Sequence, residues 1–347
     1  MERVLAWVFR VFVPPGAFSA SAAVLLLSGC QIGYVLKQGV GQIALSCRQE
    51  PLSSDELTDR LSATELKKLR WIPRFLEFSR EELGLRPGDA YQTFLDTGGE
   101  PVSHVVLAAH SRALVPYRWC FPVAGCVPYK GFFAAEDAAE EAERLRREGW
   151  DVTISPVRAY STLGWFSEPI LSTMLADDLL ELMELVFHET VHRTLYVEGR
   201  TRFNESLATH VAREGVRLFL ARHPEAAPGD ALDRFARETA LSDHDQVLLE
   251  RLRQDLETLY RSPLSPELVK ARKEELFSTA SRARRLLHGV PVDLPPSNAY
   301  LLGSLSYHEL LPALAELQAA HGGHSRGLMA YLKKVLDEKD SLPEELR

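Results

Sequence analysis

The H-E-x-x-H sequence at residues 188–192 combines residue types that bind a metal ion and move a proton. On an α-helix, residues i and i+4 share a face, so His188 and His192 can offer two imidazole nitrogens to one Zn²⁺ ion. Glu189 follows the first histidine, where its carboxylate reaches a water at the position that the protein ligands leave open. The motif predicts zinc-dependent hydrolysis with Glu189 as the general base; the alternative is two ordinary histidines on an amphipathic helix.

The residues around the motif follow a helical period. Apolar side chains recur at helical spacing between residues 175 and 197, at Leu179, Leu180, Met183, Val186, Phe187 and Val191. Acidic side chains occupy the other side, at Asp177, Asp178, Glu181 and Glu184. The pattern predicts one amphipathic helix over 175–197 that carries the motif.

A zinc site of this kind needs a third protein ligand, and two downstream glutamates qualify. One class of zinc hydrolases extends the motif with a glycine at position 195 and a third histidine ligand at position 198. This chain has Leu195 and Glu198 there, so that class is disfavoured. Glu205 follows Asn204, a good N-cap for a second helix that runs to residue 222. A short loop would fold the first turn of this helix back against the motif. We therefore expect Glu205 to be the third ligand, with Glu198 as the alternative.

A small sheet is expected beside the motif helix. The segments 105–114, 117–122, 127–133 and 152–160 are short, rich in β-branched and aromatic residues, and separated by Pro and Gly. A helix over 135–148 interrupts them. Upstream, residues 31–50, 53–61 and 62–83 read as helices, the last with a break before Pro73. The fold class is therefore α+β and mostly α, with a mostly antiparallel sheet.

The stretch 158–169 leads from the last predicted strand into the motif helix, where a substrate backbone can add to a sheet edge. Pro156 fits an edge strand. Gly164 would admit the substrate backbone, Trp165 would line a side-chain pocket, and Glu168 would hold a free α-amine. The alternative is that Glu168 caps a helix and Trp165 belongs to the core.

The chain beyond residue 222 is helical with charged faces. Segments 243–260 and 266–287 predict a hairpin of long helices, and 298–317 predicts one helix that Pro312 kinks. In that helix, Tyr307 or His308 could turn toward the metal and donate a hydrogen bond to an oxyanion. The alternative places Tyr307 in the core. Residues 30–222 and 223–347 are predicted to form one catalytic unit, the second part as a helical lobe.

The first 29 residues read as a signal peptide. Arg3 and Arg10 precede a mostly apolar run over 17–27, and Leu27-Ser28-Gly29-Cys30 resembles a bacterial lipobox. Cleavage before Cys30 would leave a lipid on its side chain, and Gln31 in the next position fits the periplasmic face of the outer membrane. An uncleaved anchor helix is the alternative. Both interpretations tether the protein to a membrane outside the cytoplasm.

Composition supports a globular body behind this tether. The chain has 347 residues, 46% of them apolar, which is enough for a sizeable core. The net charge of −8 argues against nucleic acid as a partner. Cys120 and Cys126 are spaced for either a disulfide or two free thiols.

Several stretches together resemble the bacterial family of predicted zinc aminopeptidases that are lipoproteins. They are Leu27-Ser28-Gly29-Cys30 with Ile32-Gly33-Tyr34, residues 127–133, residues 160–166, the H-E-x-x-H motif, residues 203–208, and Asn298-Ala299-Tyr300 with Tyr307. The resemblance implies a gluzincin-like metallopeptidase that uses Zn²⁺ on a peptide substrate, an aminopeptidase rather than an endopeptidase. The other expectations are a catalytically silent zinc-containing lipoprotein and a scaffold for an envelope partner.

Overall fold

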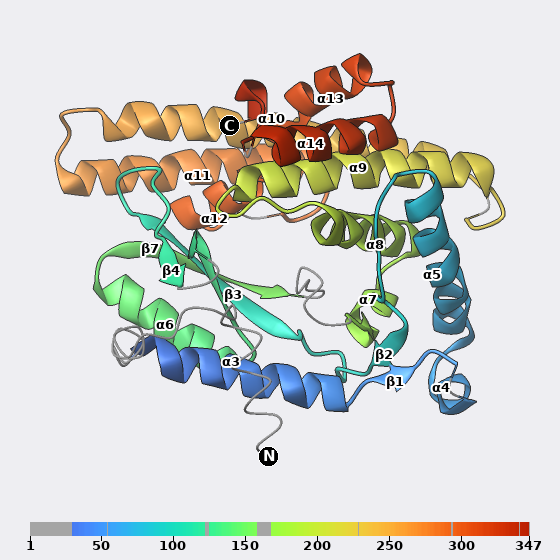
Figure 1. Cartoon of the computed structure of the whole chain (residues 1–347). Helices are drawn as coiled ribbons and strands as arrows, with labels where there is room; N and C mark the ends of the chain where they lie inside the picture. Colours follow the sequence, from blue (N-terminus) through green and yellow to red (C-terminus); the bar gives the residue numbers. More distant parts are fainter. Residues whose placement is uncertain are drawn as a thin grey trace.

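Two adjacent helices, α8 (Leu179–Thr194) and α9 (Thr201–Arg222), run through the centre of the fold (Figure 1). The computed structural model describes residues 30–53, 55–121, 125–157, 168–227, 229–292, 294–339 and 341–346. The predicted signal peptide and the predicted substrate residues Gly164 and Trp165 lie outside the described residues. Within them, helices dominate and the strands form small sheets. The predicted α+β, mostly α fold class is confirmed.

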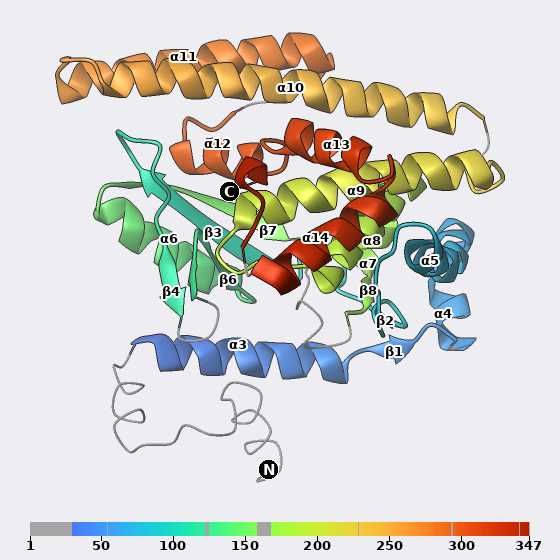
Figure 2. The same ribbon diagram turned by 45° about the horizontal axis from the view of Figure 1, so that its top comes forward.

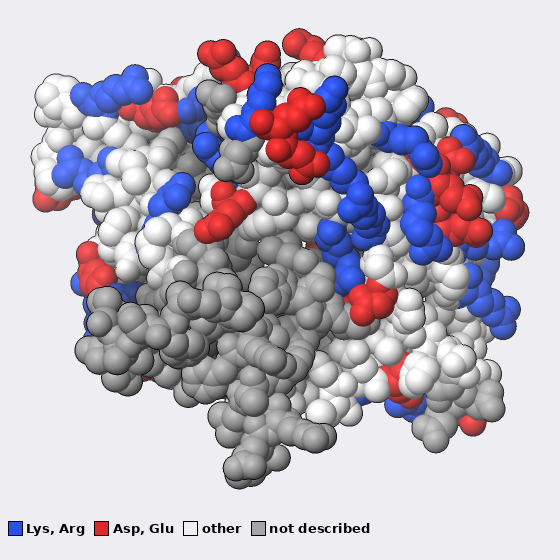
Figure 3. Space-filling view, viewed as in Figure 1, with Lys and Arg blue, Asp and Glu red and all other residues white. Residues whose placement is uncertain are grey.

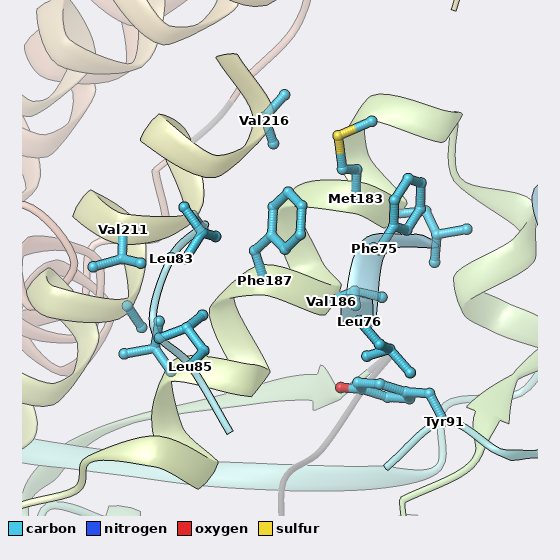
Figure 4. Close-up of a cluster of buried hydrophobic side chains, with 14 of the residues drawn as sticks. Phe75, Leu76, Leu83, Leu85, Tyr91, Met183, Val186, Phe187, Val211 and Val216 are labelled. Atoms are coloured by element: carbon cyan, nitrogen blue, oxygen red, sulfur yellow. The ribbon is translucent and has the colours of Figure 1, made fainter. Parts of the chain in front are cut away.

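The contact between α8 and α9 is close because a glycine faces it. A Cβ on Gly215 would come within 2.8 Å of side-chain atoms of both Leu83 and Phe187. Phe187 lies at the centre of the main core, with Val211 and Val216 of α9 on one side of it (Figure 4). Burying these aromatic and aliphatic groups stabilises the helix pair by roughly 1.5–3 kcal/mol for each large side chain. The pair is therefore a rigid base for the motif.

The predicted helix over 175–197 is two helices in the structure. The short α7 (Ser172–Ala176) ends before Asp177, and α8 begins after Asp178. The Asp178 side chain accepts hydrogen bonds from the backbone N–H groups of Leu180 and Glu181, at 2.7 and 3.1 Å. The Glu181 carboxylate bonds back to the backbone of Asp178, which completes a capping box. The prediction of one helix was wrong because this aspartate caps a helix instead of lying on its polar face.

A three-stranded antiparallel sheet lies beside the helix pair. Its order is β6 (Tyr129–Phe132), β3 (Ser103–His110) and β7 (Trp150–Val157), so β7 is an edge strand within the described part of the chain. Pro156 pairs with His104 at that edge, as its residue type predicted. One face packs on α6 (Ala135–Arg147) through Val106, Phe132 and Leu145. The other face meets α12 (Asn298–Leu305).

The remaining strands of the described residues form a hairpin and a second small sheet. The hairpin β4 (Trp119–Phe121) and β5 (Gly125–Val127) places Cys120 directly opposite Cys126, and the two form a disulfide. Cys47 is a free, exposed thiol. A second sheet has the order β1 (Glu50–Pro51), β2 (Thr93–Leu95) and β8 (Ile170–Leu171), with β2 and β8 parallel.

The amino-terminal helices α3 (Cys30–Cys47), α4 (Asp55–Arg60) and α5 (Ala63–Glu81) agree with the predicted segments. Ser62 and Glu65 form a capping box at the start of α5. The predicted break before Pro73 is absent, because α5 continues through this residue. Proline costs the helix one backbone hydrogen bond, and the burial of neighbouring side chains such as Ile72 and Phe75 on α8 and α9 outweighs that loss.

The long helices α10 (Ala231–Tyr260) and α11 (Pro266–His288) form the predicted hairpin, which lies on the opposite side of the molecule from α3 (Figure 2).

The predicted helix over 298–317 is broken. α12 ends at Leu305, a turn follows, and α13 (Leu311–Ala320) begins with Pro312 in its first turn. Proline is favoured at that position because the first N–H groups of a helix need no internal partner. It therefore starts a helix here instead of kinking one.

The carboxyl-terminal part of the chain joins the same core. Leu328 and Leu332 of α14 (Ser325–Lys339) and Leu346 of the short 3₁₀ helix Glu344–Leu346 pack with residues of α5, α8 and α9.

The division into domains at residue 222 stays a prediction. On the face shown in Figure 3, positive and negative side chains are interspersed over the helices. Among the described residues, no helix has both the length and the apolar character needed to cross a membrane.

Candidate metal centre and its cleft

Three side chains from the two central helices meet at one point. The Nε2 atoms of His188 and His192 on α8 are 3.2 Å apart. The Oε2 atom of Glu205 on α9 lies 3.3 Å from the first and 3.6 Å from the second. Within the described residues, this is the group of His, Cys, Asp and Glu side chains whose donor atoms lie close enough to share a metal ion. Glu198, the alternative ligand, is an exposed loop residue outside this group.

These separations fit a tetrahedral zinc ion. Three atoms at such distances lie on a circle of about 1.95 Å radius, so a point at zinc–ligand distance, ~2.0–2.1 Å, lies just above their plane. Two imidazoles and one carboxylate are the donor set of one type of catalytic zinc site, which leaves a fourth position open. The residues present therefore fit Zn²⁺.

The electrostatics of the cluster also favour a bound cation. Burial acts to raise the pKa of the Glu205 carboxyl, but hydrogen bonds from both histidines outweigh it and hold that pKa well below its usual range. Burial acts to lower the pKa of His192, and its contacts with Glu205 raise the pKa overall. The Nδ1 atom of His192 is buried and has no hydrogen-bond partner among the described residues. The Glu205 carboxyl is therefore held in its negatively charged form beside the two imidazoles.

The loop between α8 and α9 sets the position of Glu205. The Asn204 side chain accepts a hydrogen bond from the backbone N–H of Val197 and donates one to its C=O, both at 2.9 Å. The predicted capping role of Asn204 was wrong, because α9 begins at Thr201 and Asn204 is buried inside its first turn. The amide closes the loop onto the helix instead. This tie fixes the next residue, Glu205, facing α8.

Glu189 lies next to the cluster and faces the same open space. Its side chain is partly buried and lines the cleft that His188 and His192 also line. Burial raises the pKa of the Glu189 carboxyl, the two histidines act against this, and the Glu205 and Glu168 carboxylates add to the rise. A carboxylate with a raised pKa is a better proton acceptor at neutral pH.

A cleft of about 880 Å³ opens above the cluster. One wall is the face of the sheet, with Leu107, Thr153 and Ser155. The other walls come from the start of α9, from α10 and from α12 with the turn that follows it. This volume lies in the range of sites for small ligands and short peptide segments, roughly 300–1,000 Å³.

Tyr307 belongs to this cleft. It lies in the turn between α12 and α13, and its ring centroid is 6.1 Å from that of His188. Burial, together with the charges of Glu205 and Glu189, raises the pKa of its hydroxyl, so the group keeps its proton. His308, the other predicted candidate, turns away: its Nε2 accepts a hydrogen bond from Arg213 at 2.8 Å. Of the two, Tyr307 is the residue that lines the cleft.

Two further tyrosines beside the cluster were missed in the sequence. Tyr196 lies 6.2 Å from His192 between ring centroids, and it hydrogen-bonds to Tyr129, which also lines the cleft. The i+4 spacing of Tyr196 from His192 was the available signal. Tyr129 comes from β6, far along the chain, and no local pattern indicates its position.

Glu168 has a partner within the protein. Its carboxylate is 2% exposed and receives a hydrogen bond from Arg193, whose guanidinium also bonds to Asp89 at 2.7 Å. Arg193 directly follows His192, so this pair supports the carboxyl-terminal end of the motif helix. Glu168 is not among the described residues that line the cleft. Its predicted contact with a substrate amine therefore stays a prediction.

Fold and site together define a mostly helical α+β protein with a candidate metal centre in a cleft between a helix pair and an antiparallel sheet. The chain belongs to the family described as "Putative aminopeptidase", whose sequence profile matches residues 33–345. Neither the curated proteins nor the solved structures give a match to the chain. Membership of this family supports peptidase activity.

Proposed function

We propose that this protein is a zinc-dependent peptidase, and that it acts as an aminopeptidase. The observation that carries the proposal is the convergence of His188 Nε2, His192 Nε2 and Glu205 Oε2 at separations of 3.2–3.6 Å, at the floor of a cleft. Family membership supports the choice of peptide bonds as the substrate. The release of amino-terminal residues rests on the family description alone.

His188, His192 and Glu205 would hold the ion, which supplies Lewis acidity that activates a water and polarises the scissile carbonyl. Glu189 lines the same cleft and takes the proton from the attacking water. After the C–N bond breaks, the same carboxyl returns that proton to the leaving amine. The Tyr307 hydroxyl donates a hydrogen bond to the carbonyl oxygen as negative charge develops there.

Substrate placement and cellular location are further parts of the proposal. Gly164 and Trp165 would contact the substrate, and β7 offers an edge for its backbone. A lipid on Cys30 would anchor the protein in the bacterial cell envelope, at the periplasmic face of the outer membrane. Mass spectrometry of the amino-terminal peptide from membranes tests the anchor: a diacylglycerol-modified Cys30 supports it, and an intact Met1 terminus contradicts it.

Cleavage mapping tests the activity. The full chain, supplied with zinc, is incubated with a peptide mixture whose amino termini are free in one half and acetylated in the other. We expect loss of single residues from free termini only, and none with Glu189→Gln. Internal cuts in both halves would make the protein an endopeptidase. A wild-type protein that cleaves no more peptide than Glu189→Gln does would contradict the proposed activity.

A further inference from the structure

Four arginines line the cleft, and two of them are matched by acids of the cleft wall. Arg202 pairs with Glu309 at 2.5 Å. Arg253 pairs with Glu257, its neighbour one turn along α10. These two pairs neutralise their part of the wall.

The other two arginines have no acidic partner among the described residues. Arg118 precedes β4, and its side chain donates a long hydrogen bond of 3.5 Å to the backbone oxygen of Cys126. Arg200 lies in the loop that ends at the start of α9, five residues before Glu205. Both side chains are exposed and both line the cleft. Both residues therefore border the cleft, and no carboxylate among the described residues pairs with either guanidinium.

The charge of the described cleft lining, four arginines and four glutamates, is balanced, unlike the charge of the chain. The chain as a whole has 48 acidic and 40 basic residues, a net charge of −8. In the cleft, the acids outside the matched pairs are Glu189 and Glu205, and a divalent cation at the metal centre would neutralise these two. What remains is a positive charge of two on a concave surface, which concentrates anionic groups there.

We propose that the cleft recognises peptides that carry a carboxylate, and that Arg118 and Arg200 bind it. This inference rests on the proposed peptidase function and names its class of substrate. Guanidinium groups suit the task because their planar fork of N–H donors matches a carboxylate with two parallel hydrogen bonds.

The carboxylate has two possible sources in a peptide. One is the free carboxyl terminus of a short peptide, and the other is an Asp or Glu side chain near the scissile bond. Both present the same group to the arginines, so binding measurements with matched peptides must separate them. A short peptide with a free terminus would also be limited in length by the size of the cleft.

Calorimetric titration of the zinc-supplied full chain tests this, with Glu189→Gln present to prevent turnover. Three matched peptides are compared. The first is a neutral, Gln-containing peptide with an amidated carboxyl terminus, the second is the same peptide with a free carboxyl terminus, and the third is the amidated peptide with Glu in place of that Gln. We expect at least one carboxylate peptide to bind about 5- to 10-fold more tightly than the neutral amide. Preference for the free acid assigns the terminus, and preference for the Glu peptide assigns the side chain.

The preference must depend on the two arginines. Adding Arg118→Gln and Arg200→Gln together should bring the carboxylate peptides to the affinity of the neutral amide. Arg217→Gln, an exposed change on α9 away from the cleft, is the matched control and should keep the preference. Unchanged zinc content of each variant shows that the centre is intact. Equal affinity of all three peptides, or a preference that survives the double change, would overturn the inference.

The two proposals fail separately. If the wild-type protein cleaves no peptide yet the arginine-dependent preference is found, the cleft binds carboxylate peptides without hydrolysing them. If neutral and acidic peptides are cleaved equally and bound equally, the activity stands and the preference for carboxylates is wrong.

Discussion

Two of the clusters of ionisable groups among the described residues differ in how their charges are satisfied. On the hairpin, Asp245 of α10 binds Arg284 of α11 through two hydrogen bonds of 2.5 and 2.7 Å, with His288 at 3.4 Å. At the candidate metal centre, His188 Nε2, His192 Nε2 and Glu205 Oε2 lie 3.2–3.6 Å from one another. The first cluster pairs its carboxylate with a guanidinium, and the second pairs its carboxylate with two imidazoles.

This difference explains why similar residue types play different roles. A buried carboxylate is costly unless a positive group accompanies it. Arg284 provides that group for Asp245, so their cluster needs nothing from solution and serves to join two helices. Glu205 has only two imidazoles, which are weak bases, and a metal ion satisfies all three donors at once. A buried cluster that its own side chains leave incomplete is the better indicator of function.

Glu189→Gln should have the largest effect and separates catalysis from metal binding. The amide cannot accept the proton of the attacking water, so turnover should fall by about 10²- to 10⁴-fold, while zinc content stays at the wild-type value. Initial rates on the best peptide and metal analysis of the same sample check this. If Glu189→Gln loses zinc together with activity, Glu189 belongs to the metal centre and the division of roles is wrong.

Asp245→Asn should act on stability alone. Removing one partner from a buried pair leaves the Arg284 charge uncompensated and should lower the free energy of unfolding by about 3–5 kcal/mol. Urea denaturation measures this, with Asp255→Asn on an exposed part of α10 as the control. Rates per folded molecule should not change. A loss of zinc in Asp245→Asn would show that the two clusters are not independent.

Tyr307→Phe should reduce turnover without loss of zinc. Phenylalanine keeps the ring beside His188 but cannot donate to the carbonyl oxygen, which should lower kcat by about 100-fold with little change in KM. Tyr300→Phe is the matched control, because Tyr300 also lines the cleft but hydrogen-bonds to Arg284 of the hairpin cluster. Equal losses of kcat in the two proteins would contradict a special role for Tyr307.

His308 should produce a small pH dependence of stability. Burial and the neighbouring Arg213 lower the pKa of His308 to about 4. Between that value and ~6.5, the unfolded chain binds a proton that the folded protein refuses, so stability falls as pH drops through this window. With allowance for its partial exposure, the change is about 1–2 kcal/mol. In His308→Gln, the free energy of unfolding measured by urea denaturation should depend less on pH within this window. If the pH dependence does not change, it comes from groups other than His308.

Local sequence patterns predicted the parts of the site that depend on one helix or one strand. His188 and His192 share a helix, so their spacing alone brings their nitrogens together. The strands around β3 and the helix α6 were found because short apolar runs with turn residues, and a charged helical period, are local signals.

The rest depended on contacts between distant residues. Asn204 has a strong capping preference, yet its amide closes the loop to Val197, which no propensity indicates. Pro312 suggested a kink, but the position of the break was set by packing of α13 against the core. Tyr129 reaches the cleft only because β6 pairs with β3. Contacts between distant parts of the chain, which local patterns do not show, thus decided the role of each of these residues.

Zinc binding tests the central claim most directly. Metal stoichiometry and competition with a chelator are measured for the wild-type chain, for Glu205→Gln and for Glu198→Gln. We predict one zinc ion per chain in the wild type, affinity weakened by more than about 100-fold in Glu205→Gln, and wild-type affinity in Glu198→Gln. A wild-type chain that binds no zinc, or a loss in Glu198→Gln with none in Glu205→Gln, would contradict the account.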